Sequence, residues 1–243
     1  METPDEGRRR EHRVGRFSAS LREIVYGGND GIVTTFAVVA GFAGAAHGDS
    51  PVQLGALAVL IFGLANLFAD ATAMGLGSFL SSRAERDVYA SHRARELRAL
   101  RDGPEAERAG MVDLFRRQGV AEADARTLAA TYARYPELAA DFMMRHEVGL
   151  DDPGRDSAAL NGLMTFLSFL SFGAIPLIPY FLLPPEIGTF RLSVAATFGA
   201  LTLLGLLRWR VVGDGLARAV GETLLVGGVC AGVAWLVGLA FRL

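Results

Sequence analysis

Lysine is absent from this sequence of 243 residues, and cysteine occurs only once. All 24 basic residues are therefore arginine. A single cysteine excludes an intrachain disulfide bond and a metal site built from several cysteines, and Cys230 is predicted to be a small buried apolar residue. The formal net charge is only −2. Without a basic excess, the composition gives no indication of nucleic acid as a partner.

Motifs for enzymatic chemistry are missing as well. The sequence contains no Walker loop, nucleophile elbow or zincin motif, so hydrolysis and ATP-driven pumping have no residues to perform them. A Glu-x-x-His pair of the ferritin type is absent, which argues against a di-iron oxidase. We therefore predict that the chain is not an enzyme. No cleavable signal peptide, strand pattern or internal repeat is evident.

Long apolar runs dominate what is present. Hydrophobic residues make up 51% of the chain and charged residues 21%, and residues 83–156 hold 13 of the basic and 15 of the 26 acidic residues. A helix needs about 20 apolar residues to cross a bilayer. Five segments approach that length: Ile24–Ala46, Val52–Leu80, Ala158–Leu183, Phe190–Leu207 and Val220–Ala240. We expect an all-α polytopic membrane protein with five transmembrane helices and a cytoplasmic helical insert between spans two and three.

This pattern divides the chain into four regions. They are an Arg-rich cytoplasmic tail (1–22), transmembrane helices one and two (23–82), a cytoplasmic helical domain of metal-binding type (83–157) and transmembrane helices three to five (158–243). The second span is expected to continue as a stalk, because Ser81–Leu100 contains neither glycine nor proline. Proline at first turns and glycine at turns or caps predict the helices of the insert: Arg83–Arg101, Pro104–Gln118, Glu122–Arg134 and Pro136–Val148.

The distribution of arginine predicts the orientation. Of the 24 arginines, 22 lie in the N-terminal tail, in the insert or between Arg208 and Arg218, and only Arg191 and Arg242 lie on the other side. Because positively charged flanks stay in the cytoplasm, the N-terminus and the insert are predicted to be cytoplasmic and the C-terminus outside. The composition and the lack of an organellar targeting signal favour the inner membrane of a bacterial cell.

Polar residues interrupt the first two predicted spans. The first contains Asp30, and the second contains Asn66, Asp70 and Met74 at spacings of four, which places these three on one helix face. A lipid-facing aspartate costs about 2.5 to 3.5 kcal/mol at mid-helix. Asn66 and the glycines can be explained as helix-packing residues. Two aspartates on adjacent spans favour a transport pathway instead, and Met74 adds a thioether that suits first-row divalent metals.

The insert contains a second set of possible metal ligands. Met143, Met144 and Glu147 are spaced to share one helical face. His92 and Glu96 are four residues apart, and Glu105 and Glu107 lie near the start of the next predicted helix. Taken singly, the charged residues are typical of a solvated surface and the methionines of a core, so metal binding and a purely structural role are both open.

Several motifs resemble those of the vacuolar iron transporter family. The chain is similar to a bacterial-type member of this family. The resemblance covers nearly the whole chain from Arg22 and rests on four stretches: 22–36 (REIVYGGNDGIVTTF), 65–77 (ANLFADATAMGLG), 141–150 (DFMMRHEVGL) and 176–180 (PLIPY). It implies a five-span homodimer in the bilayer that exchanges cytosolic Fe²⁺, and often Mn²⁺, for protons, without a prosthetic group. The path would be lined by Asp30, Asn66, Asp70 and Met74, and the insert would gather metal through Glu96, Glu107, Met143, Met144 and Glu147.

The sequence departs from the family pattern in the insert. The family tends to pair glutamates three residues apart on the two early insert helices, whereas the later positions here are Ala99 and Gly110. Ser78 also stands where the family commonly has an acid. Nearby residues that could substitute as ligands are His92, Glu105, Asp113 and His146.

Two other functions are compatible with the sequence. One is a membrane-anchored metal-binding or regulatory protein without transport activity, in which the insert senses metal and the spans only anchor it. The other is a transporter of a different substrate, such as a small organic cation.

Overall fold

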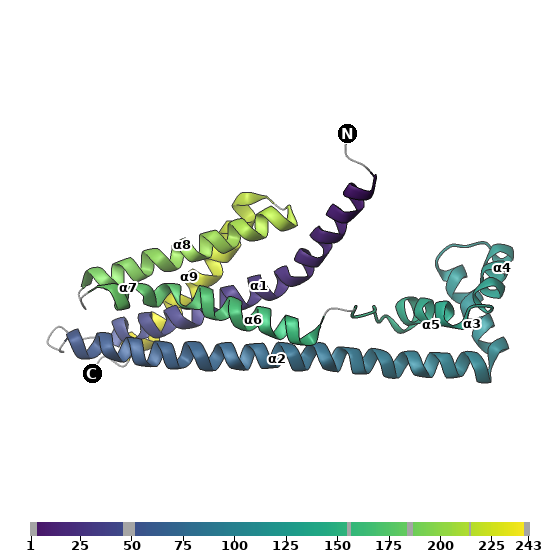
Figure 1. Cartoon of the computed structure of the whole chain (residues 1–243), viewed down its shortest axis with the longest axis horizontal. Coiled ribbons are helices and arrows are strands. Elements are labelled where there is room, and N and C mark those ends of the chain that lie inside the picture. The colour runs from purple at the N-terminus through teal and green to yellow at the C-terminus, as the bar shows by residue number, and fades with distance from the viewer. Residues whose placement is uncertain (1–3, 46–51, 155–156, 184–186, 214, 241–243) are drawn as a thin grey trace. The chain divides into compact units, whose positions relative to one another are not determined.

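Helices make up almost all of the computed structural model, which describes residues 4–45, 52–154, 157–183, 187–213 and 215–240. No strand occurs among these residues, so the all-α prediction is confirmed. The chain forms two compact units: the first comprises Met1–Phe79 with Ala159–Leu243, and the second comprises Leu80–Ala158. Helix α2 (Val52–Asp102) contributes to both and runs without a break through the predicted stalk (Figure 1).

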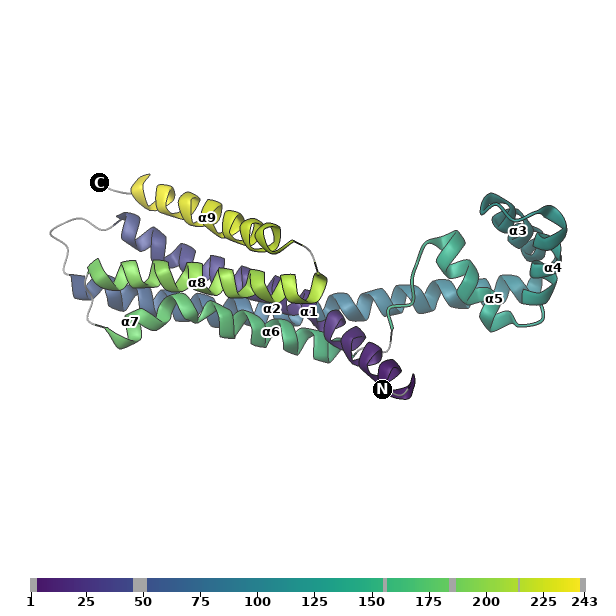
Figure 2. The ribbon, with the colours of Figure 1, turned by 90° about the horizontal axis from the view of Figure 1, so that it is seen from above.

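The first unit contains the long apolar helices. Besides the first part of α2, it holds α1 (Pro4–Ala45), α6 (Ala158–Gly173), the 3₁₀ turn η2 (Ile175–Leu177), α7 (Ile178–Leu182), α8 (Ile187–Val212) and α9 (Leu216–Ala240). Among the residues that the structure describes, four segments are long and apolar enough to cross a membrane: Leu57–Asp102, which continues into the second unit, Ala158–Leu182, Gly188–Arg210 and Leu216–Ala240. Helix α1 packs against α8 and α9 in this unit (Figure 2). These features fit a multi-pass membrane protein.

The first predicted span differs from the other four. Among the described residues, α1 is not one of the segments that meet the criteria for crossing a membrane, because Asn29 and Asp30 lie within its apolar part. The helix also begins at Pro4, so the predicted tail and the first span form one continuous helix. Ala46, the predicted end of that span, and Arg242, used for the orientation, lie outside the described residues.

The third predicted span, Ala158–Leu183, is not a single regular helix. It consists of α6, η2 and α7, with Pro176 and Pro179 in the two short segments. Proline has no N–H to donate and its ring clashes with the carbonyl four residues earlier, so two prolines three residues apart interrupt an α-helix. Ser193 of α8 donates a hydrogen bond from Oγ to the carbonyl oxygen of Pro176 at 2.6 Å, which stabilises the break.

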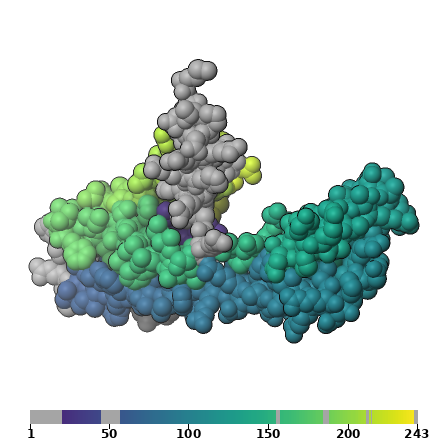
Figure 3. Space-filling model, turned by 45° about the vertical axis from the view of Figure 1, so that its right-hand side comes forward, coloured from purple at the N-terminus to yellow at the C-terminus, as the bar shows by residue number. Residues whose placement is uncertain are grey.

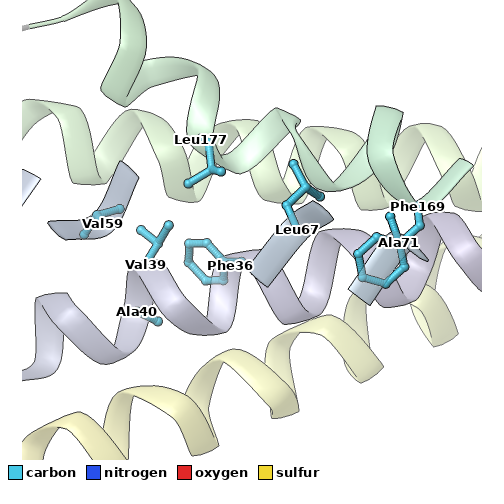
Figure 4. Packing of buried hydrophobic residues seen from close by; sticks show 8 residues of the cluster. All are labelled: Phe36, Val39, Ala40, Val59, Leu67, Ala71, Phe169 and Leu177. Atoms are coloured by element: carbon cyan, nitrogen blue, oxygen red, sulfur yellow. The ribbon is translucent and has the colours of Figure 1, made fainter. Parts of the chain in front are cut away.

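A buried hydrophobic cluster holds the first unit together. It comprises eight side chains of α1, α2, α6 and η2, which are labelled in Figure 4: Phe36, Val39, Ala40, Val59, Leu67, Ala71, Phe169 and Leu177. The backbones of α1 and α6 approach each other closely beside this cluster. A Cβ atom added at Gly31 would lie 2.5 Å from the carbonyl oxygen of Phe169. Glycine at this position is therefore a packing requirement.

The second unit has its own hydrophobic core. Around the end of α2, it contains α3 (Pro104–Arg117), α4 (Glu122–Tyr132), α5 (Pro136–Met143) and a π-helical turn, η1 (Met144–Val148); its teal-to-green surface is visible in Figure 3. The core residues are Met111, Leu114, Phe115, Ala125, Ala129, Ala139 and Met143. Pro104 and Pro136 lie in the first turns of their helices, as predicted.

The last helix of the insert differs from its prediction. Pro136–Val148 was expected to be one regular helix, but α5 ends at Met143 and the chain continues as η1. Gly149 follows in the left-handed region with φ of 74° and donates its backbone N–H to the carbonyl of Met144. That five-residue spacing widens the final turn, and π-turns of this kind are frequent at functional sites.

A substitution can test the close approach of α1 and α6. Gly31→Ala should lower the free energy of unfolding by about 1 to 3 kcal/mol, because the added methyl group meets backbone atoms that cannot rotate away. Gly199→Ala is the matched control: its helix position has open space, and alanine should stabilise it by about 0.4 to 1 kcal/mol. Thermal unfolding in detergent measures both changes. Equal unfolding temperatures for the two variants would contradict the packing argument.

Candidate functional site

The predicted polar face of α2 lies at the edge of its buried face. Gly63, Leu67, Ala71 and Gly75 are buried at spacings of four, so this stripe packs into the first unit. Each of Asn66, Asp70 and Met74 precedes a buried residue by one position and is partly buried. Successive helix residues are about 100° apart. The amide, the carboxylate and the thioether therefore form a second stripe beside the packed one.

The structure brings Asn66, Asp70 and Asp30 together. The Asn66 side-chain amide donates a hydrogen bond from Nδ2 to Oδ2 of Asp70 at 2.7 Å. Asp30 of α1 is partly buried, and its carboxylate lies within electrostatic range of the Asp70 carboxylate. Thr34 donates its hydroxyl to the backbone carbonyl of Asp30 at 2.8 Å, so it is not bonded to the carboxylate through that proton. Asn66 and Asp70 on α2 therefore form a hydrogen-bonded pair, with Asp30 of α1 within electrostatic range of it.

An open groove reaches this stripe. It has a volume of about 690 Å³ and runs between α1, α2 and α9. Small residues form much of its lining on the first two helices, including Ala37, Gly41, Ala65 and Ala69, and Asn66 also contributes. Small side chains leave room next to Asn66, and Asp70 lies one turn further along the same stripe. The arrangement can admit a hydrated ion or water to a polar face inside an apolar unit.

Two polar atoms close to Asp30 in sequence are buried without a hydrogen-bond partner among the described residues. They are Oδ1 of Asn29 and Oγ1 of Thr35. Unsatisfied buried polar atoms are rare in folded proteins and often mark a functional position. Both residues lie in the stretch 22–36 that contains Asp30, but no spacing rule marks either of them as a site residue. Carboxylate, amide and thioether groups together match the ligand preferences of first-row divalent metals.

Two predicted carboxylates of the second unit act electrostatically on a third. Glu96 of α2 lies within electrostatic range of Glu107 on α3 and Glu147 on η1. Partial burial raises the pKa of Glu96 above its ordinary value, and the negative charges of Glu107 and Glu147 raise it further. Gly110 of α3 has open space where a side chain would project. In the family pattern, Gly110 corresponds to the later glutamate of the pair that begins at Glu107, and a glutamate side chain would fit into this space.

The other predicted ligands of the insert are placed differently. Met143 and Met144 are completely or almost completely buried, and Met143 belongs to the apolar core, so packing accounts for both. Glu105 and Asp113 are paired with Arg108 at 3.7 Å and Arg117 at 3.3 Å. The His146 ring packs on Phe142 with 4.5 Å between ring centroids, and His92 is partly buried. In the described part of the chain, no three His, Cys, Asp or Glu side chains are grouped closely enough to hold a metal ion.

Arg93 fixes α5 to α2, a role that sequence patterns did not reveal. Its Nε donates to Oδ1 of Asp141 at 2.6 Å and its Nη2 donates to Oε2 of Glu137 at 2.7 Å. Hydrogen bonds to these two carboxylates raise the pKa of the Arg93 guanidinium above its ordinary value. The partners lie 48 and 44 residues away along the chain. No local spacing rule could have found them.

The carboxylate cluster predicts a pH-dependent change in stability. The folded protein holds the proton of Glu96 more tightly than the unfolded chain does, so the free energy of unfolding should fall as pH rises from about 4.5 through the raised pKa. Glu96→Gln should therefore raise the thermal midpoint of metal-free protein at pH 7 by about 1 to 3 °C, with little change at pH 4. Glu85→Gln, an exposed position on α2, is the control. A lower midpoint for Glu96→Gln at pH 7 would refute the repulsion.

Comparison with known proteins supports one family. The protein-family model described as the VIT family matches residues 21–239 of this chain. The chain is 30% identical over 226 residues to vacuolar iron transporter 1 of Arabidopsis thaliana, covering 92% of this chain and 88% of the relative. It is 30% identical over 249 residues to a vacuolar iron transporter of Toxoplasma gondii, covering 98% and 79%. The polar stripe of α2, Asp30 and the insert all fall within the matched residues, and the chain belongs to the VIT family of vacuolar iron transporters.

Proposed function

We propose that this protein transports Fe²⁺, with Mn²⁺ as a second substrate, out of the cytosol in exchange for protons. The observation that supports this function best is the meeting of Asp30, Asn66 and Asp70 on adjacent helices of an apolar unit. A membrane anchor gains nothing from carboxylates at such positions, because each is unfavourable in hydrocarbon. The relatives are named as vacuolar iron transporters, and these names support iron as the transported metal.

The chemistry of the stripe fits a divalent metal. In this proposal, Asp30 and Asp70 supply anionic oxygen ligands, and the 2.7 Å hydrogen bond from Asn66 orients the Asp70 carboxylate. Met74, one turn beyond Asp70, supplies a thioether. Sulfur together with carboxylate oxygen favours Fe²⁺ over the hard cations Mg²⁺ and Ca²⁺, which prefer oxygen ligands alone.

The same two acids can couple metal to protons. Burial away from water favours the protonated form of a carboxyl group, and a bound cation favours the ionised form. Metal entering from the cytosol would displace protons from Asp30 and Asp70, and reprotonation from the other side would release it. Two protons against one divalent ion make this exchange electroneutral, so a pH gradient alone can drive it.

The proposed assembly is a homodimer with five crossings per subunit. Helix α1 is the proposed fifth crossing: it carries Asp30 within the span and packs with α8 and α9 of the same unit. The groove beside Asn66 is open in the single chain, which supports a path completed by a second copy. The arginine distribution supports a cytoplasmic N-terminus and insert and an outside C-terminus in a bacterial inner membrane.

The insert is proposed to collect metal before transport. The negative charges of Glu107 and Glu147 act unfavourably on the ionised Glu96 carboxylate, so a bound divalent cation would offset them. Ala99 and Gly110 supply no carboxylate, which makes the insert a weaker collector than the family pattern implies.

A second candidate function rests on this carboxylate cluster alone. If the insert were a metal sensor on a membrane anchor, the purified protein would bind metal but carry none across the bilayer. Metal binding without flux in proteoliposomes would favour that function. Flux of a small organic cation in the same assay, without flux of Fe²⁺, would favour the third option, a transporter of a different substrate.

Transport in proteoliposomes tests the role of the two acids. With an inward Fe²⁺ gradient and a pH indicator, wild-type protein should move Fe²⁺ and protons in opposite directions. Asp30→Asn and Asp70→Asn should each reduce flux at least ten-fold, because a neutral amide cannot exchange a proton for metal. Asp87→Asn is the matched control, an exposed acid on α2 outside the predicted span. Full flux in both path variants would exclude the proposed mechanism.

Substitution of Met74 tests metal preference. Met74→Leu keeps the volume and apolar character but removes the sulfur, so the Fe²⁺ concentration for half-maximal flux should rise by about three- to ten-fold, with a smaller change for the harder Mn²⁺. Met164→Leu on α6, also partly buried, controls for the loss of a methionine. Identical Fe²⁺ dependence in the two variants would remove Met74 from the path.

A further inference from the structure

A second pocket with polar residues lies in the first unit. It has a volume of about 540 Å³ and is formed by α1, α8 and α9. Its polar lining comprises Arg22, Tyr26 and Asn29 of α1, Arg208 of α8, and Glu222 and Thr223 of α9, with valines between them. The proposed transport function assigns no role to this pocket. What the pocket can bind follows from its lining residues alone.

Arg208 is held in place before any ligand binds. Its Nη2 pairs with Oε2 of Glu222 at 2.9 Å, and Nε of Arg218 pairs with Oε1 of the same carboxylate at 3.0 Å. The Arg208 side chain is only 31% exposed. Because a guanidinium has five N–H donors, this pair leaves Arg208 with donors for a second anion. Glu222 pairs with Arg208 and Arg218, and Arg22 is the second arginine that lines the pocket. The lining therefore carries two positive charges and one negative charge.

The wall formed by α1 adds complementary groups. Arg22, Tyr26 and Asn29 follow a spacing of four and then three residues, which places them on one helix face. Oδ1 of Asn29 is buried and has no hydrogen-bond partner among the described residues. Arginine recognises phosphate oxygens through paired N–H donors, and the hydroxyl of exposed Tyr26 on the same face can donate to or accept from a ligand.

The pocket lies where apolar segments end. Arg22 lies two residues before the predicted first span, which starts at Ile24, with Glu23 between them, and Arg208 comes directly after the predicted fourth span, which ends at Leu207. Lipid phosphates lie at this level of a bilayer, and basic pockets between spans bind anionic headgroups there. We propose that the pocket binds a phosphate anion, either in the headgroup of an anionic lipid or free in solution.

Binding of three probes to the full-length protein in neutral detergent tests this site. The probes are a short-chain phosphatidylglycerol, whose headgroup carries phosphate and hydroxyls, the corresponding phosphatidylcholine, and inorganic phosphate. Arg208→Gln and Arg22→Gln should each weaken binding of phosphatidylglycerol by about ten-fold, since each removes one charge-assisted contact. Arg210→Gln is the matched control, because Arg210 is exposed on the same helix and does not line the pocket.

Val226→Phe provides a variant without a charge change. Val226 lines the pocket and is 45% exposed, so a larger ring should fill the space and also weaken binding, even if Arg208→Gln fails to fold. Preferred binding of phosphatidylglycerol over the other two probes would support a lipid headgroup, and equal competition by inorganic phosphate would support the free anion. Equal losses in Arg210→Gln and the pocket variants, or no effect of Val226→Phe, would overturn the site.

Discussion

A carboxylate inside an apolar helical unit needs a partner, and the structure around α2 depends on how that need is met. Asp70 accepts a 2.7 Å hydrogen bond from Asn66, and Asp30 lies within electrostatic range on the neighbouring helix. Neither acid is buried in the apolar core, because the next residue along each helix, Gly31 on α1 and Ala71 on α2, is the one that is buried. The packed stripe and the polar stripe thus share one helix without competing for the same space.

Close packing of α1 makes this arrangement possible. Gly31 directly follows Asp30 and lets the backbone of α6 approach to a distance that any side chain would prevent. The glycines of the first motif and its aspartate therefore have different tasks in one turn of helix: the glycine sets the packing, and the aspartate remains at the edge. The small residues that line the groove beside Asn66 extend the same principle along α1 and α2.

The second unit balances charge differently from the first. Its core of methionine, leucine, alanine and phenylalanine side chains is apolar, while Glu96 lies within electrostatic range of Glu107 and Glu147. Arg93 neutralises Glu137 and Asp141 rather than this cluster, so the repulsion persists beside a well-paired ion cluster. The two potential metal-handling sites thus differ in kind, since one is set among apolar helices and the other is formed by carboxylates at the surface of a charged unit.

The sequence alone determined the helical class, the apolar segments beyond the first, the first-turn prolines of the insert and the shared face of Asn66, Asp70 and Met74, because helix periodicity and proline chemistry are local. It also identified the family, since the motifs around Asp30 and Asp70 are short and specific. Only the tertiary structure decided that Asp30 lies near Asp70, that Arg93 pairs with residues more than 40 positions away, and that Met143 fills a core. Contacts between distant segments depend on how helices pack, and no spacing within one helix encodes them.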